Sequence, residues 1–186
     1  MDEVVELIEE GCGVYSGVGS RCVNRIMYNR IVEIARYMDD KGWRLRTGDA
    51  IGCDEAFRSG ARNKDVYISK PENYDNYSWD KATDIARKYH PKFDELHDMA
   101  KVYHIRNSFQ ILGDDLESPS DLVICYTKDG AVSDEDRSIR TGGTGQVISI
   151  ADDYDVNIVN LGKMEHRDVF FNDILPRYYN DYVDEE

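Results

Sequence analysis

The sequence predicts an α/β protein: a single Rossmann-like domain with a mostly parallel sheet of about five or more strands and helices on both faces. Short apolar runs typical of strands alternate with segments whose apolar residues recur at helical spacing, and this alternation favours a parallel sheet. Glycine-bearing segments stand where strands are expected to lead into helices. A length of 186 residues with 41% hydrophobic content suits one domain spanning residues 1–186.

The elements are expected in the following order. A short acidic helix over 3–9 precedes the first strand at 12–16, and helical spacing then runs from Cys22 to Asp40. Further strands are expected at 43–46, 65–69, 121–127 and 157–161, and further helices from Asp54, over 80–113 with a break at His90-Pro91, over 144–153 and over 170–182 before an acidic tail. The aromatic segment 72–79 is expected to be an exposed loop that either covers a site or packs on its own domain.

The charge balance restricts the partners of the protein. A formal net charge of -14 argues against nucleic-acid binding, because phosphate-backbone affinity comes mainly from clustered Lys and Arg. Any anion-binding site must therefore be built from a few arginines and backbone amides inside an acidic surface. The N-terminal residues contain no basic region and no long apolar run, so we expect neither a signal peptide nor a membrane span, and we expect a cytoplasmic location.

Cysteine and histidine spacing gives no indication of a metal site. The four cysteines, Cys12, Cys22, Cys53 and Cys125, are scattered and are expected to be free thiols, with Cys12 and Cys125 buried in strands. His90, His97 and His104 recur every seven residues, but Pro91 breaks the helical register, so surface or structural roles are favoured over metal binding.

Four segments are candidates for a phosphate-binding cradle. Glycine lets backbone amides approach an anion closely, and a helix starting there adds the positive end of its dipole. We expect both the loop from Gly17 to Arg21 and the amides of Gly143 to Gln146 to contact one anion. The candidate residues are Ser16, Gly17, Gly19, Ser20, Arg21, Gly48, Asp49, Gly52, Asp54, Arg106, Asn107, Gly142, Gly143, Thr144, Gly145 and Gln146.

Two carboxylates follow the second glycine segment, at the expected start of a helix. Asp54 and Glu55 can accept hydrogen bonds from ribose hydroxyls or act as a general base, and they are the candidate catalytic residues. Asp54 can also be the N-cap of the helix. Replacing Arg21 or Arg106 by alanine is expected to weaken ligand binding with little change in folding.

The order of these motifs resembles the SLOG superfamily, which groups DprA/Smf DNA-processing proteins, LOG phosphoribohydrolases, molybdenum-cofactor carriers and small YspA-like proteins. The resemblance covers roughly residues 12–162 and rests on Ser-Gly-x-Gly-Ser-Arg at 16–21, Thr-Gly-x-x-x-Gly-x-Asp-Glu-Ala at 47–56, Arg-Asn at 106–107, Asp-Leu-Val-Ile-Cys-Tyr at 121–126 and Gly-Gly-Thr-Gly at 142–145. The YspA-like branch is the most similar. The resemblance implies a domain that binds a nucleotide or an ADP-ribose-like ligand through Ser16, Gly17, Arg21, Asp54, Arg106, Asn107, Gly143 and Thr144.

This chain departs from the LOG pattern at the last glycine segment. No proline precedes Gly142, and the residues that follow it lack the glutamate that assists N-glycosidic cleavage in LOG enzymes. The leading hypothesis is therefore a nucleotide-binding sensor, carrier or sequestering protein. The alternatives are a nucleotide N-glycosidase or ribosyl transferase that uses Asp54 or Glu55 and, less favoured, a DprA-like single-stranded DNA-binding protein. Tyr-rich segments are compatible with a homo-oligomer, which relatives in the superfamily often form.

Overall fold

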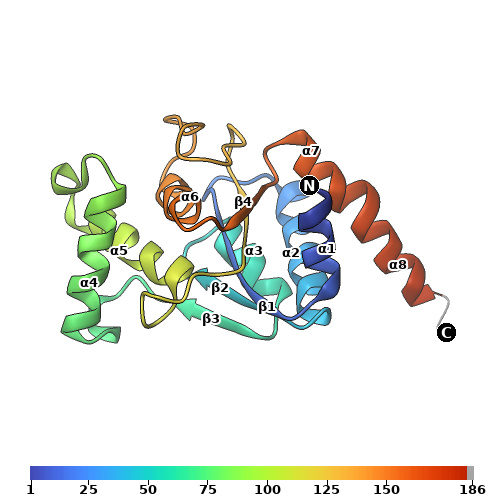
Figure 1. The fold of residues 1–186 in the computed structure, drawn as a ribbon, viewed down its shortest axis with the longest axis horizontal. Coiled ribbons are helices and arrows are strands. Elements are labelled where there is room, and N and C mark those ends of the chain that lie inside the picture. The colour runs from blue at the N-terminus through green and yellow to red at the C-terminus, as the bar shows by residue number, and fades with distance from the viewer. Residues whose placement is uncertain (184–186) are drawn as a thin grey trace.

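The computed structural model describes residues 1–183 and contains a five-stranded parallel sheet with strand order β3-β2-β1-β4-β5. Helices precede and connect the strands along the chain (Figure 1). The elements are α1 (Asp2–Glu10), β1 (Gly13–Gly19), α2 (Arg25–Asp40), β2 (Trp43–Gly48), α3 (Cys53–Gly60), β3 (Lys64–Tyr67), η1 (Pro71–Asn73), α4 (Asn76–Tyr89), η2 (Phe93–Glu95), α5 (Asp98–Leu112), β4 (Leu122–Tyr126), α6 (Thr144–Asp153), β5 (Asn157–Asn160), α7 (Met164–Asp168), η3 (Val169–Ile174) and α8 (Leu175–Val183). The prediction of an α/β fold with a parallel sheet is confirmed.

Both faces of the sheet are covered by helices. Strand β4 shows the principle, because Leu122 and Ile124 point into one hydrophobic cluster while Val123 and Cys125 point into the other. The first cluster is completed by α1, α2, α3 and the C-terminal helices, and the second by α4, α5 and α6. In Figure 1, α4 and α5 lie to the left of the sheet, and α1, α2 and α8 lie to the right.

The order of the strands places a crevice between β1 and β4. The chain runs from β1 through α2 to β2 and β3 on one side, whereas β4 leads through α6 to β5 on the other side. The connections therefore diverge beyond the carboxyl ends of β1 and β4. Ligands of open parallel sheets bind at such a topological switch point.

Two of the sequence-based expectations about local structure are wrong. Most of the segment 72–79 is helical, since η1 and α4 occupy much of it, and Tyr74 stacks on Phe109 with ring centroids 4.5 Å apart. These aromatic rings pack on their own domain because Phe109 offers them a buried surface. Cys12 is exposed, since it precedes β1 with a φ of 64°, while Cys125 is buried as expected.

The ends of the chain and of β1 also differ from expectation. Strand β1 extends to Gly19, so Gly17 and Gly19 belong to a strand and not to a loop. The acidic tail expected at 184–186 lies outside the described residues. Within residues 1–183, no helix is long and apolar enough to cross a membrane.

Candidate functional site

A cleft of about 510 Å³ opens at the carboxyl ends of β1 and β4, at the switch point of the sheet. Its walls come from the end of β1, the loop after β1, helix α5, and the long segment from Lys128 to the start of α6. The lining residues that sequence reasoning had selected are Gly19, Ser20, Arg21, Asp54, Arg106, Asn107, Gly142, Gly143 and Thr144. The first and last glycine segments therefore share one cleft.

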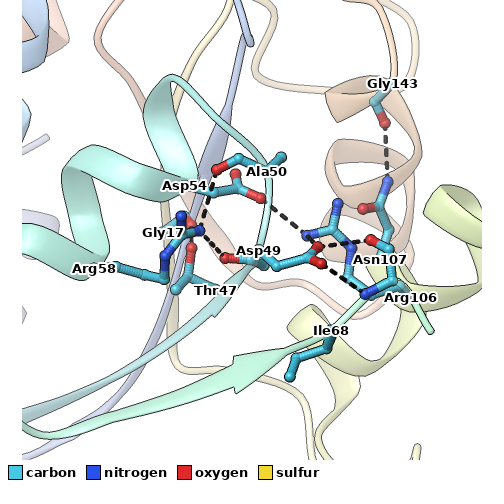
Figure 2. Close-up of polar contacts among 12 residues, drawn as sticks. Gly17, Thr47, Asp49, Ala50, Asp54, Arg58, Ile68, Arg106, Asn107 and Gly143 are labelled. Atoms are coloured by element: carbon cyan, nitrogen blue, oxygen red, sulfur yellow. Dashed lines mark hydrogen bonds and ion pairs between the residues drawn. The ribbon is translucent and has the colours of Figure 1, made fainter. Parts of the chain in front are cut away.

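The amino end of α6 forms one wall of this cleft. Gly143 is the N-cap residue, and no described residue accepts a hydrogen bond from the amides of Gly143 or Thr144. Gly142 has a φ of +62° and nothing within 4 Å of the position a Cβ would take. Asn107 Nδ2 donates to the Gly143 carbonyl at 3.3 Å and holds the turn against α5 (Figure 2). The wall thus offers backbone donors to the cleft.

Three exposed cations surround the mouth of the cleft: Arg21, Lys128 and Arg140. The Arg21 guanidinium lies 5.6 Å from the ring centroid of Tyr103, and among the described residues no carboxylate forms an ion pair with any of the three. These three cations gather at one cleft and leave a local positive charge there on an acidic protein.

The floor of the cleft contains a buried ion pair between α5 and α3. Arg106 Nη1 lies 2.9 Å from Asp54 Oδ2 and 3.9 Å from Asp49 Oδ1 (Figure 2). A Cβ at Gly48 would overlap Arg106 Nη1, so this glycine makes room for the guanidinium. Burial raises the pKa of the Asp54 carboxyl, and the positive charge of Arg106 opposes that rise. Hydrogen bonds from Ser69 and the charge of Arg106 lower the pKa of Asp49 against the effect of burial.

Two buried donors on the same face of α5 lack a partner. Arg106 Nε and Gln110 Nε2 are both inaccessible to solvent, and no described residue accepts a hydrogen bond from either. The two residues are four apart on the helix, so they face the same direction, and both line the cleft. Unpartnered buried donors are unfavourable, so these two atoms reduce the stability of the folded protein.

His104 and Gln146 join α5 to α6 beside the N-cap. His104 Nδ1 lies 2.6 Å from Gln146 Oε1, and the Asn107 amide approaches the same oxygen at 3.5 Å. Burial lowers the pKa of His104 to about 4, and Gln146 opposes this shift. Sequence reasoning treated His104 as surface or structural, yet it lines the cleft.

Several predicted residues support the cleft without lining it. Ser16 Oγ donates to the Gln110 carbonyl at 2.8 Å, and Gly17 packs against Phe57 and Leu45. The backbone carbonyls of Ser20 and Arg21 lie against Gly52, so a side chain at position 52 would have no room. The other predicted residues outside the lining are Gly48, Asp49, Glu55, Gly145 and Gln146, of which Gly145 packs against Arg137.

The structure separates the two candidate catalytic carboxylates. Asp54 is 4% exposed and lines the cleft, whereas Glu55 is exposed on α3 and does not. The N-cap interpretation of Asp54 is wrong, because Gly52 is the N-cap residue and the Asp54 carboxylate accepts from Arg106. Consecutive helical residues point about 100° apart, and the orientation of α3 turns Asp54 toward the cleft and Glu55 toward solvent.

Sequence reasoning missed part of the lining, namely Val18, Cys22, Ala50, Ala100, Tyr103, His104, Gln110, Lys128, Ile139, Thr141 and Val147. Spacing along α5 contained a usable signal, since 103, 106, 107 and 110 recur on one helical face around the selected Arg106 and Asn107. Lys128 had a positional signal, because it follows a buried central strand.

No group of three or more His, Cys, Asp or Glu residues that could hold a metal ion occurs in the part of the chain that the structure describes. In comparisons with protein-family models, with curated proteins and with solved structures, this chain gives no significant match. Membership of the SLOG superfamily therefore stays a prediction from the motifs.

Proposed function

We propose that the protein binds a nucleotide or a nucleotide-derived anion, such as an ADP-ribose-like ligand, in the cleft between β1 and β4. The observation that carries this proposal is the convergence of Arg21, Lys128 and Arg140 with the start of α6 on one cleft of an acidic protein. The open amides of Gly143 and Thr144 would bind a phosphate.

The size of the positive surface favours a small ligand. Sequence-independent binding of a nucleic acid requires many phosphate contacts from Lys and Arg, and here Arg44, Arg62 and Arg87 are already paired with carboxylates. A net charge of -14 adds long-range repulsion of a polyanion. A cytoplasmic sensor, carrier or sequestering protein of the YspA-like kind is the role that we propose, and formation of a homo-oligomer belongs to the same hypothesis.

Calorimetry with orthophosphate, AMP, ADP and ADP-ribose tests the proposal. We expect at least one nucleotide to bind, and Arg21→Ala, Lys128→Ala and Arg140→Ala each to weaken binding by about 1.5–3 kcal/mol for a lost charged hydrogen bond. Arg62→Ala is the matched control, because Arg62 is exposed and precedes β3, at the opposite edge of the sheet. Equal affinities in all four variants, or no binding by the panel, would contradict the proposal.

The position of Asp54 favours one second candidate, a nucleotide N-glycosidase. In that reaction water adds to C1′ of the ribose, the N-glycosidic bond breaks and the base leaves with a proton. A buried carboxyl with a raised pKa on the cleft floor is suited to supply that proton, although its bond to Arg106 favours the carboxylate form.

Chromatography of nucleoside monophosphates after incubation with the protein separates binder from enzyme. We expect slow or no release of free base, because the segment from Gly142 to Ile150 contains no glutamate where LOG enzymes have theirs. Robust release that is lost in Asp54→Asn and kept in Glu55→Gln would replace the binding proposal by the enzyme. Glu55 is the matched control because it is exposed outside the cleft.

A further inference from the structure

A chain of buried hydrogen bonds determines which nitrogen of His104 carries a proton. Ser108 Oγ donates to the Ala82 carbonyl at 3.3 Å, so its lone pairs are left to accept from Gln146 Nε2 at 3.4 Å. The opposite atom of that amide, Gln146 Oε1, then faces His104 Nδ1 at 2.6 Å. Since Oε1 can only accept, Nδ1 must donate and carries the proton.

The surroundings of His104 also keep its ring neutral. Burial comes first, and positive charge from His90 at the end of α4, from Arg106 on α5 and from Arg137 in the segment before α6 adds to it. Gln146 on α6 is uncharged. These effects hold the pKa of His104 at about 4, far below neutral pH. A neutral ring with its proton on Nδ1 has a lone pair on Nε2.

The His104 ring lies beside the open wall of the cleft. The side chain is 9% exposed, and its Cε1 atom, which is bonded to Nε2, lies 3.9 Å from where a Cβ of Gly143 would be. Among residues 1–183, no donor forms a hydrogen bond to Nε2. The other polar groups of the lining include the donors of Arg21, Arg106 and Lys128, the amides at the start of α6, and the Asp54 carboxylate, which already accepts from Arg106.

We propose that His104 Nε2 accepts a hydrogen bond from a neutral donor group on the ligand, a hydroxyl or an amino group, next to the bound anion. This inference rests on the proposed function and narrows it, because the ligand must carry an anionic group and a neutral donor within the same small molecule. Nucleoside monophosphates carry both, with hydroxyls on the ribose and an amino group on several bases. His104 is thus a specificity-determining residue.

Nitrogen-15 NMR of the histidine rings tests the proposal in the protein as it is. At pH 7 we expect His104 to be neutral with the proton on Nδ1, and its Nε2 resonance to move on addition of AMP in the direction of an accepted hydrogen bond. A proton on Nε2, or a charged ring, in the free protein would overturn the proposal even if AMP binds. An Nε2 resonance that stays unchanged in the AMP complex would do the same.

His104→Asn gives an independent test. The asparagine amide can replace Nδ1–H in the bond to Gln146, but it cannot reach the position of Nε2. We expect AMP to bind roughly 3- to 10-fold more weakly, as for loss of one neutral hydrogen bond, and orthophosphate to bind as before. His97→Asn is the matched control, because His97 is an exposed N-cap residue of α5, where asparagine is equally suitable.

The outcomes separate this inference from the proposed function. The affinities of AMP, its 2′-deoxy and 3′-deoxy forms and purine riboside 5′-monophosphate show which ligand group donates to His104. The unmodified protein should bind AMP more tightly than the analogue that lacks this group. His104→Asn should bind the two with equal affinity. Unchanged AMP affinity in a folded His104→Asn overturns the inference alone. Failure of every nucleotide and of orthophosphate to bind the unmodified protein overturns the proposed function, and the inference with it.

Discussion

Two glycine-rich junctions at the same edge of the sheet have opposite environments. Between β2 and α3, the space beside Gly48 is filled by the Arg106 guanidinium, and Gly52 packs on the carbonyls of the neighbouring loop. Between β4 and α6, Gly142 has no atom within 4 Å of an added Cβ, and Gly143 has only His104 at 3.9 Å. The first junction is occupied by the protein itself, while the second is open.

The difference shows that glycine at a strand-to-helix junction serves two purposes. At Gly48, glycine lets the Arg106 side chain from α5 approach the backbone, and Arg106 there forms a buried ion pair with Asp54. At Gly142 and Gly143 it leaves backbone donors accessible. Both junctions suggest phosphate binding in the sequence, but only the second one has room for it.

Gly48→Ala should give the largest effect. The new methyl group would displace Arg106 from Asp54, and separating a buried ion pair costs about 3–5 kcal/mol of the free energy of unfolding. Urea denaturation measures this loss. Gly143→Ala is the control and should change stability little, since its φ of -63° suits any residue. Equal stabilities of the two variants would contradict the distinction between filled and open junctions.

Arg106→Met should be nearly as harmful to stability. It leaves the Asp54 carboxylate buried without its partner, which costs about 3 kcal/mol, so the expectation that changing Arg106 affects binding alone does not fit its 4% exposure. Adding Asp54→Asn should restore part of the loss, because the orphaned charge is then removed. A double-mutant cycle by urea denaturation checks this coupling, and additive losses would show that the pair is not energetically linked.

Acidification should lower the free energy of unfolding through His104, which lies beside the open junction. The pKa of His104 is about 4 in the folded protein against an ordinary 6.5, so the unfolded chain binds the proton first as the pH falls. The stabilisation is complete above about pH 6.5 and is lost progressively toward pH 4, amounting to about 2 kcal/mol at about pH 5. Unfolding measured between pH 7.5 and 4 should show this loss in the unmodified protein. His104→Asn should lack that part of the pH dependence, and identical profiles would contradict the assignment.

The smallest expected effect comes from filling the open junction. Gly143→Leu should fold normally, because the backbone at 143 is helical and the nearest atom to an added Cβ is 3.9 Å away. The longer side chain should obstruct the cleft and weaken AMP binding by about tenfold, or about 1.4 kcal/mol. Calorimetry together with thermal unfolding measures both properties. A folded variant with undiminished affinity would place the nucleotide elsewhere.

Within the described residues, the sequence by itself determined the fold class and most of the secondary structure, but not the helical state of 72–79 or the extent of β1. Periodicity placed α6 at Thr144–Asp153 and the buried run in β4, because the alternation of apolar residues follows from local geometry and burial. It also placed the first and last glycine segments at one edge of the sheet, since the carboxyl ends of parallel strands meet there. The sequence did not show which glycines make room for a neighbouring side chain and which leave backbone amides open.

Only the tertiary structure decided which junction is open and which residues face the cleft. The neighbour that fills the space at Gly48 is Arg106, far along the chain, and the choice between Asp54 and Glu55 depends on how α3 is rotated against α5. The proton on His104 is set by Ser108 and Ala82 through Gln146, three residues from separate helices. The positions of strands and helices leave a periodic pattern in the local sequence, whereas the surroundings of a side chain depend on contacts that form only when distant segments pack together.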